Sequence, residues 1–216
     1  GRSRYPSLPS LPESEVAVMV RIIGITGGIA SGKSTVTEFL RRQGYQVIDA
    51  DQVVHELQER GGRLYQALLS TFGSSILQED GRLDRPKLGA MIFGNPELLE
   101  QSSQIQNQII CEELAGRRDL LAETEDIFFM DLPLLFELQY EDWFDQIWLV
   151  DVTEETQLSR LMSRNALSQE EAEKRIAAQL SLREKRKRAD VLIDNNGSLE
   201  ATRQQIRDAL QKLERS

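Results

Sequence analysis

Five short apolar runs along the chain predict buried strands, and amphipathic stretches between them predict helices. The runs are rich in β-branched and aromatic residues, and they fall within residues 22–26, 45–48, 127–131, 147–151 and 189–197. A helical pattern after the first run places Val36, Phe39 and Leu40 on one face, and an amphipathic helix from Ser198 to Leu213 closes the chain. This alternation of strands and helices predicts an α/β fold with about five parallel strands.

A glycine-rich loop separates the first predicted strand from the first predicted helix. Residues 27–34 read GGIASGKS and match the pattern G-x-x-x-x-G-K-[ST]. Loops of this kind turn backbone N–H groups toward phosphate oxygens, and the following helix adds a partial positive charge. Lys33 can place its ammonium on the β- and γ-phosphates, and the Ser34 hydroxyl can bind Mg²⁺. We predict a nucleotide-phosphate site formed by Gly28, Ile29, Ala30, Ser31, Gly32, Lys33, Ser34 and Thr35.

Acidic residues follow several of the predicted strands. Asp49 and Asp51 come after the second strand, and ligands gather at the carboxyl ends of parallel strands, so both are expected near the phosphate loop. One of the two can cap the helix predicted at 52–59 while the other does chemistry, and the pattern does not decide which. Asp131 ends the third strand at a Walker-B position, where a carboxylate holds Mg²⁺ directly or through water. Asp151 directly precedes a helix start, which favours a structural role.

Two arginines one helical turn apart predict a lid. Arg160 and Arg164 lie at the end of a helix with Leu158, Leu161 and Met162 inward, and Ser168 opens the next helix with a capping box. We expect a lid at about 160–182 that brings guanidinium groups over the nucleotide phosphates, with a solvated charged face as the alternative. The basic run at 185–188 either attracts polyphosphate ligands or, more simply, forms a solvated helix face.

The long segment between the second and third strands is mostly helical in pattern. Residues 61–118 are too many for a plain crossover connection. We expect an acceptor-binding subdomain at 61–118, and the alternative is two or three extra helices that only pack. His55, the single histidine, lies one turn after Asp51 and is more often structural than functional in such a setting. Without a cluster of His and Cys residues, a transition-metal site is not expected.

Composition narrows the possible partners. A net charge of −9 argues against general nucleic-acid binding, and no apolar run is long enough to cross a membrane. Cys111 is the only cysteine, which excludes an internal disulfide and fits a reducing compartment. Residues 1–20 are rich in Pro and Ser and predict a disordered leader, with the functional domain at 21–216.

These features favour a small-molecule kinase over other phosphate-loop proteins. The chain has no N-K-x-D or T-K-x-D segment, which a guanine-reading GTPase switch needs. A small-molecule kinase needs the phosphate loop, an acid near the acceptor hydroxyl and arginines on a mobile lid, and all three occur here in order. We predict a P-loop NTPase fold, with a five-stranded parallel sheet flanked by helices, a helical acceptor-binding insertion and a lid. A nucleoside-monophosphate or other metabolite kinase and a nucleotide-dependent regulatory module remain alternatives.

Separated motifs from Arg21 to the C-terminus resemble the dephospho-coenzyme A kinase family. They are GITGGIASGKSTV at 24–36, VIDAD at 47–51, DGRLDR at 80–85, PLLFE at 133–137, Arg160-x-x-x-Arg164, RIAAQ at 175–179 and AD-x-x-I-x-N-x-G at 189–197. The chain departs from the family pattern at Ala30, usually a glycine, and at Gln106-Asn107, where the family often carries His-Pro.

The resemblance implies phosphorylation of the ribose 3′-hydroxyl of dephospho-coenzyme A by ATP, giving coenzyme A and ADP in the cytoplasm. It further implies that Asp51 is the base, that the mid-chain helices bind the coenzyme A part and that Asn195 lies by the adenine of ATP. We therefore expect Asp51, Lys33 and Arg164 to be catalytic, Arg160 and Asn195 to join the loop in binding ATP, and Ser34 and Asp131 to bind Mg²⁺. The expected partner is dephospho-coenzyme A, without nucleic acid or membrane, and the protein is expected to be a monomer or small homo-oligomer.

Overall fold

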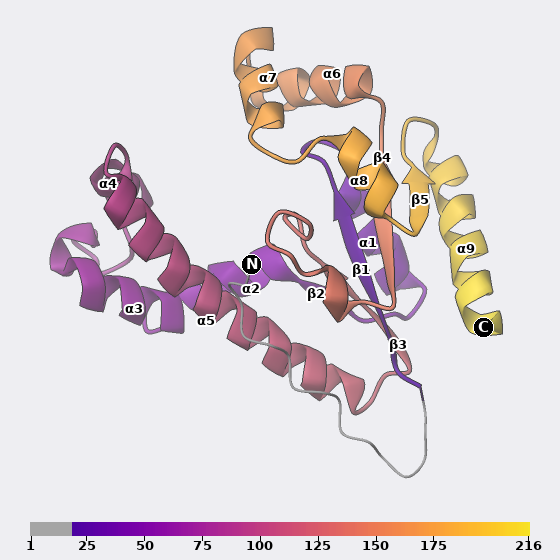
Figure 1. The fold of residues 1–216 in the computed structure, drawn as a ribbon, viewed down its shortest axis with the longest axis horizontal. Helices are drawn as coiled ribbons and strands as arrows, with labels where there is room; N and C mark the ends of the chain where they lie inside the picture. Colours follow the sequence, from indigo (N-terminus) through magenta and orange to yellow (C-terminus); the bar gives the residue numbers. More distant parts are fainter. Residues whose placement is uncertain (1–18) are drawn as a thin grey trace. The chain divides into compact units, whose positions relative to one another are not determined.

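The computed structural model describes residues 19–216 and divides them into two units. Ala50–Leu121 form the first unit, here called the helical unit, while residues 19–49 and 122–216 form the second, called the sheet unit. Figure 1 shows the course of the chain through both. Residues 1–18 of the expected leader lie outside the described residues.

The sheet unit contains five parallel strands, which confirms the predicted fold class. The strands are β1 (Arg21–Gly27), β2 (Val47–Asp49), β3 (Ile127–Asp131), β4 (Gln146–Asp151) and β5 (Val191–Asp194). Their order is β2-β3-β1-β4-β5, so β1 is central and pairs with β3 and β4. In register, Asp131 lies opposite both Ile25 and Asp49. The carboxyl ends of β1, β2 and β3 thus meet at one edge of the sheet, beside the glycine loop.

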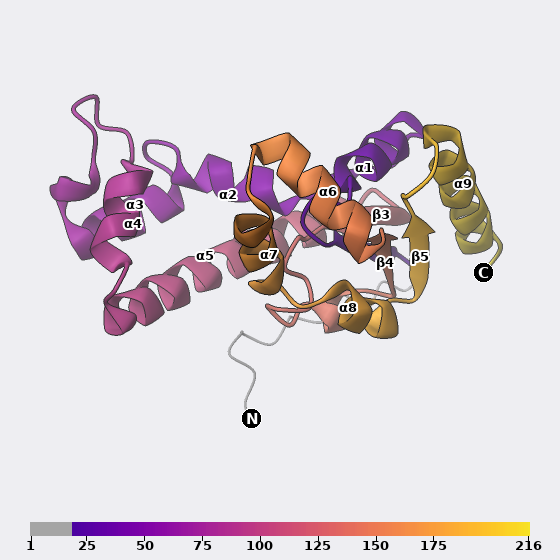
Figure 2. The ribbon, with the colours of Figure 1, turned by 90° about the horizontal axis from the view of Figure 1, so that it is seen from above.

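Helices cover both faces of this sheet. The helices of the sheet unit are α1 (Lys33–Arg42), α6 (Glu154–Asn165), α7 (Gln169–Ala177), α8 (Leu182–Arg188) and α9 (Leu199–Arg215), with a 3₁₀ turn, η2 (Glu141–Trp143). Phe39 of α1 and Ile206 of α9 pack with Trp148 and other strand residues in the main core, whereas Leu182 of α8 packs on Leu149. Figure 2 shows α1 and α9 on one side of the strands and α8 on the other. Because both faces are buried, β1 reads as a nearly continuous apolar run.

The helical unit packs around its own small core. It consists of α2 (Ala50–Gln58), α3 (Arg63–Phe72), the 3₁₀ turn η1 (Ser74–Ile76), α4 (Arg85–Ile92) and most of α5 (Pro96–Ala122). The core side chains are Tyr65, Leu68, Ile76, Leu83, Leu88 and Ile92. Asp84 caps α4 by accepting a hydrogen bond from the backbone N–H of Lys87 at 3.1 Å. The segment predicted to be helical is therefore helical, and its expected role in acceptor binding stays a prediction.

Some element boundaries differ from the sequence-based expectation. The helix predicted at 52–59 begins two residues earlier, at Ala50, directly after β2. This places Asp51 in the first turn of α2, where a carboxylate is favoured by the helix dipole. In α6, Leu161 is buried as expected, but Leu158 and Met162 are only partly buried, and Gln157 is buried instead.

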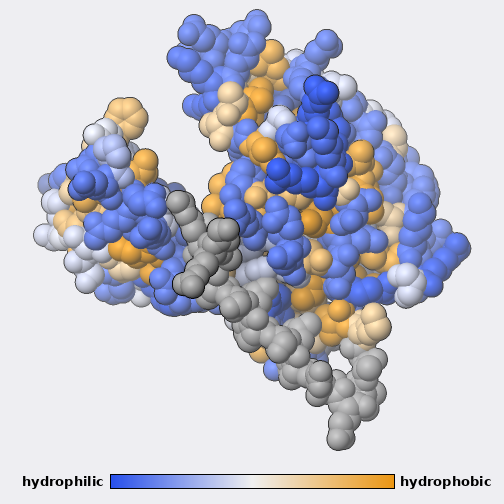
Figure 3. Space-filling model, viewed as in Figure 1, coloured by the Kyte–Doolittle hydropathy of each residue, from blue (hydrophilic) through white to orange (hydrophobic). Residues whose placement is uncertain are grey.

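One face of the molecule is drawn as a space-filling view in Figure 3. On the face drawn in Figure 3, hydrophilic residues predominate and the apolar residues form separate patches. Within residues 19–216, no helix combines the length and the apolar character needed to cross a membrane.

Candidate nucleotide-phosphate site

The glycine loop leaves β1 and enters α1 through two residues in the left-handed region. Gly32, with φ of 79°, is the residue directly before α1, and Ala30 has φ of 61°. A left-handed conformation costs an ordinary residue roughly 1–2 kcal/mol, and glycine adopts it freely. The position where the family usually carries glycine is thus one where glycine would be unstrained, and this chain holds Ala30 in that conformation.

Glycine at two loop positions is also required by close packing. A methyl group on Gly28 would lie 2.6 Å from Nε2 of Gln157, and one on Gly32 would collide with the side-chain amide of Asn195. Both neighbours are polar side chains that contact the loop. The glycines therefore let the loop approach residues that hold it in place.

Three side chains from distant parts of the sheet unit donate hydrogen bonds to carbonyl oxygens of the loop. Nε2 of Gln157 donates to Ile29 at 3.0 Å, Nδ2 of Asn195 donates to Ser31 at 2.8 Å, and Nζ of Lys185 donates to Gly27 at 3.2 Å. Asn195 is itself fixed, since its Oδ1 accepts from the Thr202 hydroxyl at 2.9 Å. These bonds fix the loop backbone in shape before any ligand binds, which lowers the entropy cost of binding.

Lys33 forms an ion pair with Asp131 at the end of β3. The two side chains are 17% and 9% exposed, so the pair is largely shielded from water. Register places Asp131 beside Ile25, two residues before the loop. The structure thus brings together the predicted phosphate-binding lysine and the predicted Walker-B carboxylate.

Lys185 is a residue of this site that the sequence analysis missed. Its side chain is fully buried, and its Nζ lies 3.2 Å from Oε2 of Glu137. Burial lowers the pKa of the Lys185 ammonium, Glu137 opposes that shift, and the nearby charge of Lys33 adds to it. Glu137 also accepts from the backbone N–H of Leu180 at 3.3 Å.

The expectation of a solvated face for residues 185–188 is therefore wrong for Lys185. The sequence signal for the burial of Lys185 was its helical spacing from Leu182 and Ala189, which places the three residues on one inward face. The neighbouring Arg186 donates through Nε to both carboxylate oxygens of Asp151 at 2.9 Å. That contact gives Asp151 the structural role expected of it. Lys187 and Arg188, the last two residues of the basic run, are exposed.

A cavity of about 670 Å³ lies against the outer side of the loop. Its lining includes the predicted residues Ala30, Gly32, Ser34, Thr35, Arg160, Arg164 and Asn195. An NH2 group of Arg160 donates to the backbone carbonyl of Asn195 at 2.9 Å, and Nε of the exposed Arg164 donates to Asn165 at 2.9 Å. Two arginine side chains, several hydroxyl groups and the N-terminus of α1 thus line one cavity, which suits a polyphosphate.

Asp51 and Asp49 belong to different units. Asp49 ends β2 in the sheet unit, and Asp51 is an exposed residue of α2 in the helical unit. The expected roles of both carboxylates stay predictions.

A G-x-x-x-x-G-K-S loop between a central parallel strand and a helix, with arginines on the adjoining cavity, defines a P-loop protein of the kinase class. Comparison with known proteins gives the family. The family model described as dephospho-CoA kinase matches residues 21–201, and the chain belongs to that family.

Individual relatives agree with this family. The chain is 59% identical to a dephospho-CoA kinase of Streptococcus mutans over 196 residues, which cover 91% of the chain and 99% of the relative. A crystal structure of TT1252 from Thermus thermophilus is similar with a TM-score of 0.71 and 34% identity, covering 90% of this chain and 98% of that one. A dephospho-CoA kinase structure from Campylobacter jejuni has a TM-score of 0.69 and 28% identity, covering 89% and 96%.

Proposed function

We propose that this protein transfers the γ-phosphoryl group of ATP to the ribose 3′-hydroxyl of dephospho-coenzyme A, giving coenzyme A and ADP. The observation that carries the proposal is the family match over residues 21–201, which includes the phosphate loop. The O3′–P bond forms, the bond from the γ-phosphorus to the bridging oxygen breaks, and the 3′-hydroxyl proton passes to a carboxylate.

The loop and its surroundings supply the ATP site in this proposal. Residues 28–35 bind the phosphates through backbone N–H groups, and Lys33 neutralises charge that grows on the transferring group. Arg160 and Arg164 reach the phosphates from the cavity wall as part of a lid at about 160–182, and Asn195 lies beside the nucleoside. The cavity shared by these residues supports this arrangement.

The residues present fit a magnesium ion. Protein sites for Mg²⁺ use one or two oxygen ligands together with substrate phosphates, and the Ser34 hydroxyl and the Asp131 carboxylate are such ligands. When bound, the ion supplies positive charge to the phosphate oxygens. Asp131 holds Lys33 in the structure, so the same carboxylate serves both the ion and the lysine in our proposal.

Asp51 is the proposed acceptor-side base. A weakly nucleophilic hydroxyl is oriented by a carboxylate at about 2.6–3.2 Å, which takes its proton as the new bond forms. Because phosphoryl transfer passes through a loose transition state, orientation contributes more than basicity. Asp49 is the competing candidate, and its place at the end of β2, in register with Asp131, suits a bracing role.

The helical unit is the proposed binding site for the acceptor, with 61–118 as its predicted extent. We also propose a cytoplasmic monomer or small homo-oligomer without nucleic-acid partners. The single cysteine supports the cytoplasmic location, and the net charge of −9 supports the absence of nucleic-acid partners.

A coupled assay of ADP release tests the proposal. Dephospho-coenzyme A, nucleoside monophosphates and small sugars are offered as acceptors at equal concentration, with a no-acceptor control. We expect dephospho-coenzyme A to give by far the highest kcat/KM. A higher value for a nucleoside monophosphate or a sugar would assign the protein to another kinase activity, and acceptor-independent ADP release would point to a nucleotide-dependent regulatory module.

A further inference from the structure

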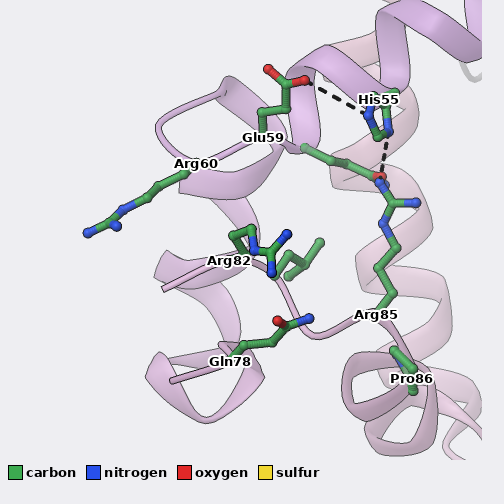
Figure 4. A pocket seen from close by; sticks show the side chains of 9 residues that line it. His55, Glu59, Arg60, Gln78, Arg82, Arg85 and Pro86 are labelled. Atoms are coloured by element: carbon green, nitrogen blue, oxygen red, sulfur yellow. Dashed lines mark hydrogen bonds and ion pairs between the residues drawn. The ribbon is translucent and has the colours of Figure 1, made fainter. Parts of the chain in front are cut away.

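The helical unit contains a cavity of its own, of about 640 Å³. Its lining includes His55 of α2, Glu59 and Arg60 just after that helix, Gln78 and Arg82 from the turn before α4, and Arg85 at the start of α4. Figure 4 shows these side chains around the hollow. A volume of this size is within the range of pockets that bind small molecules.

The cavity wall is rich in positive charge. Three arginines line the cavity, and Glu59 is the one carboxylate among its lining residues. Arg60 donates to the backbone carbonyl of Asp80 at 3.3 Å, and in Figure 4 it points away from Arg85. Arg82 and Gln78 lie on one side of the hollow, with Arg85 on the other. Two guanidinium groups and an amide therefore remain to contact a ligand.

Arg85 is oriented by a neutral partner. Its NH2 group lies 3.2 Å from Nδ1 of His55. A guanidinium has only donors, so Nδ1 must accept, and the ring proton is then on Nε2. That Nε2 faces the Glu59 carboxylate at 3.9 Å. Within residues 19–216, Arg85 has no carboxylate at ion-pair distance, so its charge is held in place without being neutralised.

The turn that carries Arg82 and Gln78 is braced by the unit's core. The backbone N–H of Gln78 donates to the carbonyl of Arg82 at 2.7 Å, and the Tyr65 hydroxyl donates to Gly81 at 2.5 Å. Arg82 is also bonded to Asp80 through Nε at 2.7 Å, an exposed pair that leaves its remaining N–H groups available. The basic side chains therefore project from a fixed frame.

We propose that this cavity binds the diphosphate group of the acceptor, with Arg82, Arg85 and Gln78 donating to phosphate oxygens and His55 positioning Arg85. The inference rests on the proposed function, since a nucleotide acceptor supplies a diphosphate that the reaction leaves intact. Guanidinium groups bind phosphate oxygens through paired, charge-assisted hydrogen bonds, so Arg is suited to this ligand. Contacts to this part of the acceptor stabilise the ground state and the transition state equally, so losing them should raise KM and leave kcat unchanged.

The test measures binding of dephospho-coenzyme A by titration calorimetry, with ADP saturating the phosphate loop. We expect Arg85→Gln and Arg82→Gln each to raise the Kd by at least about tenfold. In turnover assays, both should raise the KM for dephospho-coenzyme A while kcat and the KM for ATP stay near those of the parent. Arg63→Gln is the matched control, because Arg63 is an exposed arginine of the same unit, paired with Glu112 at 2.7 Å and outside the cavity lining.

Two further ligands identify which part of the acceptor is bound. Adenosine lacks the diphosphate, so its Kd should be the same for Arg85→Gln and parent, and inorganic diphosphate should compete with dephospho-coenzyme A in the parent only. An equal loss for adenosine would mean general damage to the unit and would overturn the assignment. Binding of inorganic diphosphate with unchanged dephospho-coenzyme A affinity in the variants would mean a free-anion site and would also overturn it.

The positioning role of His55 has its own measurement. His55→Asn retains an acceptor near the place of Nδ1, and His55→Ala removes it. We expect His55→Ala to raise the KM for dephospho-coenzyme A and His55→Asn to have a KM close to that of the parent. Equal KM values for the two variants would exclude the positioning role. If the parent does not phosphorylate dephospho-coenzyme A at all, the proposed function fails; if it does while the arginine variants behave like the parent, only this subsite fails.

Discussion

Replacing Lys185 by methionine tests how the buried ion pair supports the phosphate loop. The change keeps most of the side-chain volume but removes the ammonium that contacts Glu137 and the carbonyl of Gly27, both at 3.2 Å. Removing one partner of a buried pair costs about 3–5 kcal/mol, because the other charge stays buried without compensation. Glu137 is 19% exposed and keeps its bond from Leu180, which places the expected loss at the lower end, about 3 kcal/mol.

Urea unfolding, followed by circular dichroism, measures this loss. Lys187→Met is the matched control, since Lys187 is a 62% exposed lysine of the same helix and should change the free energy of unfolding by about 0.5 kcal/mol or less. Adding Glu137→Gln to Lys185→Met should recover at least about 1 kcal/mol, because it removes the uncompensated charge. If Lys185→Met unfolds like Lys187→Met, the pair does not hold the loop and the reasoning is refuted.

Four other predictions concern the reaction and the pH dependence of stability. Lys33→Ala should lower kcat by orders of magnitude in a protein that still folds, although the unfolding midpoint should fall because Asp131 loses its ion-pair partner. Near-parent turnover would exclude the role of Lys33 on the phosphates. Arg164→Lys should lose nearly as much turnover as Arg164→Ala, because lysine lacks the planar fork; parent-like behaviour of both would favour a solvated face. Asp51→Asn should lower kcat strongly with little change in ATP affinity, whereas a larger effect of Asp49→Asn would reverse the two roles. Burial and the hydrogen bond to a neighbouring carboxylate raise the pKa of Tyr45 from 10.0 to about 12, so its stabilising contribution is complete below pH 10 and is lost as the pH rises through 12. An absorbance titration should show a late-titrating tyrosine that Tyr45→Phe removes, and a titration unchanged by that substitution would contradict the assignment.

Local patterns in the sequence were sufficient to predict the sheet and the loop. Apolar runs bounded by turn residues located all five strands. The runs of β1, β3 and β4 are continuous because these strands are buried on both faces, whereas the edge strands β2 and β5 are partly exposed and were located by their short β-branched runs. The spacing of glycines around Lys33 located the loop, since that local pattern is typical of a phosphate-binding loop. Arg160 and Arg164 were singled out by their spacing, and the structure places both on the cavity beside the loop.

Residues that act through long-range contacts were not predictable in this way. Gln157 and Lys185 each bond a loop carbonyl more than a hundred positions away in the chain, and a polar residue in a helix looks solvated until its tertiary partner is known. The basic cavity of the helical unit is similar, because Arg85 and His55 are thirty positions apart and lie in different helices. Which distant residues come into contact depends on how the helices and strands pack, and the periodicity of apolar residues in the sequence does not determine that packing.

The central claim is that the acceptor is phosphorylated on its ribose 3′-oxygen. The most direct measurement is ³¹P NMR of the product formed from ATP and dephospho-coenzyme A, with the site of attachment assigned by phosphorus coupling to the ribose protons. We predict one new phosphomonoester signal coupled to the 3′ proton, an unchanged diphosphate signal and one ADP per product. ADP formation with inorganic phosphate alone, or a monoester at any other hydroxyl, would contradict the claim.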